Sequence, residues 1–140
     1  MTKDVLVYVS GVHTEEEQNE PIVLVTAGTY YYKNKKHFIF YEEIDEDGTV
    51  SKNTIKVASN MVDLIRKGVT SSHMIFEVGK ENLTYYDTPY GSMLMGITTS
   101  NCSFKEINDR RMELNIDYAL SIDGKHMSDC NIEIKIKAKE

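Results

Sequence analysis

The sequence contains no long apolar run, and none of its hydrophobic stretches approaches the ~20 residues that a membrane-spanning helix needs. Residues 1–4 lead directly into an alternating pattern, without the basic start and apolar core of a secretory signal peptide. The sequence therefore predicts a cytoplasmic protein with no membrane partner. Its two cysteines, Cys102 and Cys130, fit a reducing compartment, and no disulfide is expected between them.

The signatures of common catalytic sites are absent as well. There is no Walker loop, no dinucleotide fingerprint, no Gly-x-Ser-x-Gly elbow and no Cys-x-x-Cys pair. The histidines are scattered without metal-ligand spacing, at His13, His37, His73 and His126. Although ligands from separate strands can converge on a metal, the sequence predicts no metal and no cofactor. It favours a non-catalytic protein over an enzyme.

An excess of positive charge is also missing, since the formal net charge is −6 and is spread along the chain. An acidic surface repels phosphate backbones, so nucleic acid is not expected as a partner. The length of 140 residues suits one domain with a substantial core, here predicted to span 1–140.

Two segments near the C-terminus alternate strictly between apolar and other residues. The apolar positions are Met112, Leu114, Ile116, Tyr118 and Leu120 in the first, and Cys130, Ile132, Ile134, Ile136 and Ala138 in the second. Successive side chains of a strand point to opposite faces, so each segment has one buried face. Because Asp123-Gly124 between them supplies hairpin geometry, we expect an antiparallel hairpin with Ile116 and Ile134 buried and Lys135 and Lys137 exposed.

Strand-like runs with turn residues between them continue along the rest of the chain. They cover 3–13, 21–33, 36–45, 49–58, 71–78, 82–88, 92–107, 110–121 and 126–138. The segment 61–68 fits either a short helix or a further strand, and its alternation favours the strand. Gly28 and Gly96 fall inside strands, where glycine often marks the bend that a barrel needs for closure. The pattern predicts an all-β, antiparallel up-and-down barrel of about 8–10 strands.

Charged residues in phase with apolar ones are the first candidates for a site. Glu42 follows Phe38 and Phe40 at every second position, and Arg66 follows Leu64 in the same way. The sequence therefore predicts that Glu42 and Arg66 point inward, where an unpaired charge would be costly. They form either a structural ion pair or a polar anchor for a ligand inside the barrel.

Tyrosine is unusually frequent, with nine in the chain. Tyr30, Tyr85 and Tyr118 fall in phase with predicted core residues. A buried tyrosine needs a partner for its hydroxyl, and such rings either fill a core or line a ligand pocket. Together with Glu42 and Arg66, they are the candidate ligand-binding residues.

The strand predicted at 21–33 is apolar on both faces. Its outer face must be covered by another segment or by a second subunit, because large apolar patches are rare on monomers. With the apolar residues 93–95, this pattern predicts a homo-oligomer, most simply a homodimer.

Several short motifs resemble a known family when taken in order. They are Gly28-Thr29-Tyr30, Tyr41-Glu42-Glu43, Ile65-Arg66-x-Gly68, Tyr86-x-Thr88-Pro89-Tyr90-Gly91 and Tyr118-x-Leu120. The chain resembles the YwiB-like family of small bacterial proteins of unknown function over nearly its whole length. The resemblance implies a calycin-like barrel, similar in architecture to lipocalins, and implies no activity.

These observations favour a protein that binds a small amphipathic molecule inside its barrel. The alternative is a structural or interaction module whose barrel is filled and whose outer face forms a homo-oligomer. An enzyme with Glu42 or Glu43 as a base is the third, less favoured class.

Overall fold

The computed structural model describes residues 3–13, 22–44 and 46–139, and in these ranges the secondary structure consists of strands. The strands are β1 (Asp4–His13), β2 (Ile22–Lys33), β3 (Lys36–Ile44), β4 (Val50–Val57), β5 (Val62–Lys67), β6 (Ser72–Phe76), β7 (Glu81–Thr88), β8 (Gly91–Asn108), β9 (Arg111–Ile122) and β10 (Lys125–Ala138). The predicted strands are confirmed with small shifts at their ends, and 61–68 is a strand, β5. Positions 21 and 45, expected to belong to strands, lie outside the described residues.

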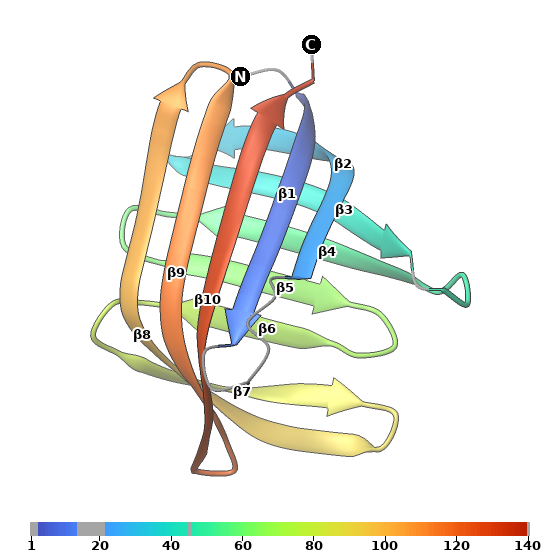
Figure 1. Cartoon of the computed structure of the whole chain (residues 1–140), viewed down its shortest axis with the longest axis vertical. Coiled ribbons are helices and arrows are strands. Elements are labelled where there is room, and N and C mark those ends of the chain that lie inside the picture. Colours follow the sequence, from blue (N-terminus) through green and yellow to red (C-terminus); the bar gives the residue numbers. More distant parts are fainter. Residues whose placement is uncertain (1–2, 14–21, 45, 140) are drawn as a thin grey trace.

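The ten strands form one antiparallel sheet that closes almost completely into a barrel (Figure 1). Their order is β6-β5-β4-β3-β2-β1-β10-β9-β8-β7, so the first strand pairs with the last, from Val5 opposite Ala138 to His13 opposite Cys130. Among the described residues, β6 and β7 form no continuous ladder, and beside β6 Ser71 makes one isolated bridge with Asp87, with two backbone hydrogen bonds of 2.9 Å. The predicted antiparallel barrel is therefore confirmed, with its weak seam at β6–β7.

The barrel is flattened into two layers that cross steeply. Figure 1 shows β8, β9, β10 and β1 side by side in front of β3 to β7. Strand β2 passes from one layer to the other, because residues 22–29 pair with β1 and residues 28–33 pair with β3. Gly28 lies at this corner, where a Cβ atom would come within 2.7 Å of the Phe40 carbonyl oxygen. The glycine therefore permits the close approach that bends the strand.

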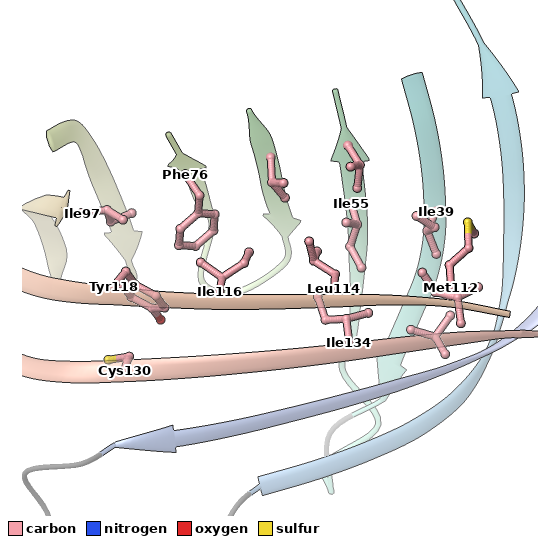
Figure 2. Packing of buried hydrophobic residues seen from close by; sticks show 14 of the residues in the cluster. Ile39, Ile55, Phe76, Ile97, Met112, Leu114, Ile116, Tyr118, Cys130 and Ile134 are labelled. Carbon is pink, nitrogen blue, oxygen red and sulfur yellow. The ribbon is translucent and has the colours of Figure 1, made fainter. Parts of the chain in front are cut away.

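The centre of the barrel is filled by apolar side chains from both layers. In Figure 2, Leu114 and Ile116 of β9 and Ile134 of β10 point toward Ile39 and Ile55 of the opposite layer, and all five are buried. This packing confirms the predicted β9–β10 hairpin, whose Asp123 and Gly124 have φ angles of 49° and 86°. Lys135 and Lys137 are exposed, as expected.

The predicted orientation of β3 is wrong by one residue. Its inward side chains are His37, Ile39, Tyr41 and Glu43, whereas Phe38 is only partly buried and Phe40, Glu42 and Ile44 are exposed. Both rows of this strand contain apolar residues, so the alternation was compatible with either choice. Glu42 therefore lies on the outer surface.

Strand β7 corrects a second prediction. Tyr85 is 64% exposed and lies on the outer face with Leu83, whereas the inward positions include Asn82, Thr84 and Tyr86. The inner row of β7 contains no aliphatic residue, and Tyr86 is its member that packs against the core. The prediction that Tyr85 points inward, which rested on its alternation with apolar residues, was therefore wrong.

Candidate ligand site at one end of the barrel

The five candidate residues do not converge on one site. Tyr118 is buried in the filled centre, where its ring packs edge-on against Phe76 at 5.0 Å between centroids. Glu42 and Tyr85 are on the outer surface. Tyr30 and Arg66 line opposite ends of the barrel, as described next.

At one end Arg66 does form an ion pair, but with Glu43 rather than Glu42. Its guanidinium donates to Glu43 Oε1 at 2.8 Å and to the Ser51 hydroxyl at 3.3 Å, and Asn53 also donates to Glu43 Oε1 at 3.0 Å. We call these four residues the Arg66 cluster. The Arg66 and Glu43 side chains are 30% and 28% exposed, so the pair is half-buried. Each charge has its partners within the protein, and the inward phase predicted for Arg66 is confirmed.

At the other end, His37 stands at the start of the same inward row of β3. Its Nδ1 lies 2.7 Å from the Tyr30 hydroxyl, and its Nε2 lies 3.5 Å from Glu106 Oε1. The imidazole also packs against the Tyr32 and Phe104 rings, each with its centroid 4.8 Å away. We call these five residues the His37 cluster. The histidine is only 9% exposed, and its ring contacts aromatic and polar neighbours.

The surroundings of His37 select one tautomer. The Glu106 carboxylate can only accept hydrogen bonds, so Nε2 carries the proton and Nδ1 accepts from the Tyr30 O–H. Burial lowers the pKa of His37 below its ordinary value, and the nearby Glu106 carboxylate opposes this effect. Burial also raises the pKa of the Tyr30 hydroxyl. Both groups are therefore neutral at pH 7, and the Nε2–H points toward the end of the barrel.

Two hollows meet at the His37 cluster, since His37 and Glu106 line both. The larger has a volume of about 640 Å³ and lies between β8 and the turn from β4 to β5. The second, of about 590 Å³, runs past Tyr30, Tyr32 and Lys3. The apolar lining of the larger hollow includes Val57, Val62 and Phe104. Its charged lining consists of Lys35, Lys105 and Glu106 beside His37.

A β-bulge in β8 turns Phe104 and Glu106 toward the hollow. The pairing of β8 with β9 shifts between Thr99 and Asn101, so the inward row changes from odd to even positions. Cys102 and Phe104 consequently pack against the core. Without the bulge, strict alternation would have placed them outside, which is why the sequence pattern did not reveal them.

His37 was also missed as a site residue, although the sequence held a signal for it. The tight hairpin at Asn34 and Lys35, which both have positive φ angles, pairs His37 with Tyr32 and brings Tyr30 onto the same face. Two tyrosines and a histidine on one face of a hairpin end would have indicated this cluster.

The described part of the chain contains histidine, cysteine and acidic side chains on several strands. Within it, no group of three or more His, Cys, Asp or Glu side chains could hold a metal ion. In the same residues, no helix is long and apolar enough to cross a membrane. Cys102 and Cys130 form no disulfide, and Cys130 is buried.

Comparisons with known proteins agree on the fold. The family described as "Domain of unknown function (DUF1934)" matches residues 7–134. The "Uncharacterized beta-barrel protein YwiB" of Bacillus subtilis (strain 168) is 23% identical over 118 residues, which cover 84% of this chain and 82% of that protein. The crystal structure of ywiB protein from Bacillus subtilis superposes with a TM-score of 0.86 at 20% identity, covering 99% of this chain and 93% of that one. This likeness bears on the barrel, not on an activity.

Proposed function

The chain belongs to the DUF1934 family of domains of unknown function, and from this premise we propose that it is a non-catalytic protein that binds a small amphipathic molecule at the His37 cluster. The setting proposed for this activity is the cytoplasm. The ligand occupies the end of the barrel rather than its centre, because side chains such as Ile116 and Ile134 already fill the centre.

The hollow of about 640 Å³ is the observation that carries this proposal. Small-molecule sites typically have volumes of roughly 300–1,000 Å³, with mostly apolar walls and a few convergent polar groups. Here Val57, Val62 and Phe104 provide the apolar wall, and the His37 Nε2–H is a polar group directed into the hollow. An amphipathic molecule matches this combination of apolar and polar lining.

Binding of the neutral dye N-phenyl-1-naphthylamine tests the proposal. Its fluorescence should rise on binding, and the Ala58→Trp variant, which adds bulk inside the hollow, should abolish the rise. Ala119→Trp is the matched control, because Ala119 lies on the outer side of β9. The proposal fails if the dye does not bind, or if it binds equally well to both variants.

Cysteine labelling gives a second, independent measurement. Cys102 lines the hollow and is partly exposed, whereas Cys130 is buried in the core. Bound dye should slow alkylation of Cys102 by iodoacetamide, with Cys130 as the internal reference for unfolding. Unchanged labelling of Cys102 at saturating dye would place the dye elsewhere.

The second candidate is a structural or interaction module that forms a homodimer through the outer surface of β2, β3 and β4. The exposed apolar residues of this surface favour it. We define this surface by its exposed apolar residues, which are Val25, Tyr31, Phe40, Ile44 and Val50. Glu42 and Lys52 are cross-strand partners among them. A two-fold contact sets a surface against its own copy, so the acidic residue of one subunit can meet the basic residue of the other.

Light scattering at micromolar concentration tests the dimer. The native chain should give the mass of two chains, and Phe40→Glu should give the mass of one. Tyr85→Glu, which changes an exposed aromatic residue outside this surface, should leave the dimer intact. A monomeric mass for the native chain would contradict the proposal.

A further inference from the structure

If the proposed function holds, the residues around the hollows also indicate the chemical class of the ligand. We infer that the His37 cluster recognises a flat aromatic anion, with its acidic group at His37 Nε2–H and its ring among the neighbouring aromatic side chains. The inference rests on three features of the described residues: the charge around the hollows, the donor presented by His37 and the aromatic surfaces beside it.

The charge around the two hollows is opposite to that of the whole chain. Among the described residues that line them, Lys3, Lys35 and Lys105 are basic and Glu106 is acidic. The chain as a whole has a formal net charge of −6. Charges of one sign gathered around a concave site attract ligands of the other sign. The local excess of lysine therefore favours an anion.

His37 adds a directed hydrogen-bond donor to this positive surrounding. The Tyr30 hydroxyl lies 2.7 Å from Nδ1 and can donate to it, which leaves Nε2–H to donate to an acidic group. Glu106 lies 3.5 Å from Nε2, which is too long for a strong hydrogen bond, and its side chain is 63% exposed. The carboxylate or sulfonate of a ligand can take this position at a shorter distance while Glu106 turns outward to water.

The rings around His37 indicate what the rest of the ligand looks like. Tyr32 and Phe104 lie against His37 at interplanar angles of 56° and 49°, so each ring is oblique to the imidazole. Val57 and Val62 line the larger hollow together with Phe104, and Tyr32 lines the second hollow. Aromatic rings favour offset or edge-on contacts with other rings, so a flat aromatic body suits this space.

An aromatic cation is the main competing ligand, because Glu106 and the aromatic faces would both attract it. Two observations weigh against it. The lysines outnumber the carboxylate, and the Tyr30 hydroxyl can donate to His37 Nδ1 and so leave Nε2–H as a donor for an acidic group. The experiment therefore includes a cationic competitor.

The test compares two dyes that share one aromatic body. 1-Anilinonaphthalene-8-sulfonate carries a sulfonate, and N-phenyl-1-naphthylamine is its uncharged counterpart. The sulfonate should bind about five- to tenfold more tightly, as expected for one favourable charge contact in a partly desolvated site. Its advantage should shrink as salt concentration rises. Cationic 1-naphthylmethylamine should compete poorly with either dye.

Three variants assign the preference to the cluster. Lys35→Gln and Tyr30→Phe should each lower affinity for the sulfonate about two- to fivefold more than affinity for the neutral dye, since they remove a charge and the hydroxyl partner of His37 Nδ1 respectively. Lys135→Gln, on the exposed side of β10, is the matched charge control and should change neither dye. Circular dichroism of each variant checks that it is folded.

The outcomes separate this inference from the proposed function. If the neutral dye binds at the hollow and the sulfonate has no advantage, the inference is overturned and the proposed function stands. Tighter binding of the cation also overturns it. If neither dye binds, both proposals fail.

Discussion

The inward row of β3 begins at His37 and ends at Glu43. Each end places an ionisable side chain partly out of water, and the two side chains are stabilised in different ways. Glu43 is half-buried and receives hydrogen bonds from Arg66 and Asn53, so the carboxylate is neutralised within the protein. His37 is more deeply buried, stays uncharged and keeps one donor pointing outward. The first arrangement is internally satisfied, whereas the second has hydrogen-bonding capacity left for a ligand.

The His37 end also has more open space beside it than the Arg66 end. The crevice at the Arg66 cluster has a volume of about 160 Å³, and the larger hollow at the His37 cluster has about 640 Å³. Between them the core is continuous, through residues such as Ile39 and Ile55. Charged residues that alternate in step with core residues are therefore poor indicators of a binding site when they pair with each other. A neutral polar group beside an open hollow is a better indicator.

The largest effect should come from the packed centre that separates the two ends. Ile134→Ala removes buried methyl groups and should lower the free energy of unfolding by about 2–5 kcal/mol. Lys135→Ala, at the exposed neighbouring position, should cost much less. Chemical denaturation measures both. Equal, small losses would mean that the centre is not the common support of the two ends.

The Arg66 end should be the next most sensitive. Arg66→Met leaves the Glu43 carboxylate half-buried with Asn53 as its remaining donor. The loss should be about 1–3 kcal/mol, between the values for exposed and fully buried ion pairs. Thermal melts of Arg66→Met alone and with Glu43→Gln measure it, and the double variant should recover part of the loss. Glu42→Gln is the matched control, because Glu42 is exposed; a loss there equal to that of Glu43→Gln would refute the pairing.

At the His37 end, single changes should cost less. Tyr30→Phe removes one neutral hydrogen bond to His37 Nδ1 and should lower the free energy of unfolding by about 0.5–1.5 kcal/mol. Tyr32→Phe keeps the ring that packs on His37 and serves as the comparison. Urea denaturation curves should rank the two in this order. The reverse order would show that the Tyr30–His37 bond does not hold this end.

The smallest expected effect is a pH dependence confined to the His37 end. In the unfolded chain His37 takes up a proton near its ordinary pKa of 6.5, and burial lowers the pKa in the folded state. The unfolded state therefore binds more protons between the two pKa values, so stability falls as pH drops below about 6.5. His37→Gln should flatten this part of the curve of melting temperature against pH. An unchanged slope in the variant would assign the dependence to other groups.

Most of the fold could be predicted from the sequence, because β9 and β10 have apolar residues on one face only. Leu114 and Ile134 could not be placed outside without exposing the whole buried row. β3 is different, since Ile39 and Tyr41 compete with Phe38 and Phe40 for the inward side. Local alternation cannot decide between two apolar rows, and the prediction of Glu42 as an inward residue failed for this reason.

The candidate site was less predictable, because it depends on features that alternation does not encode. The bulge near Asn101 reverses the inward row of β8 and brings Phe104 beside His37. These two residues are far apart in the sequence and on strands that do not pair. The prediction that Arg66 points inward was correct. Glu42 was the wrong partner, because the other row of β3, which contains Glu43, faces the core.

The pairing of β1 with β10 has a consequence for how the protein is made. During synthesis β1 leaves the ribosome before the nine other strands, and its partner at residues 125–138 follows the rest of them. Until then one edge of β1 has unpaired backbone groups, an arrangement that invites aggregation with other nascent chains. Such a contact between distant segments also carries a high loop-closure entropy and slows folding. Completion of the barrel must therefore wait until residues 125–138 have left the ribosome, and until then β1 is exposed to pairing with other chains.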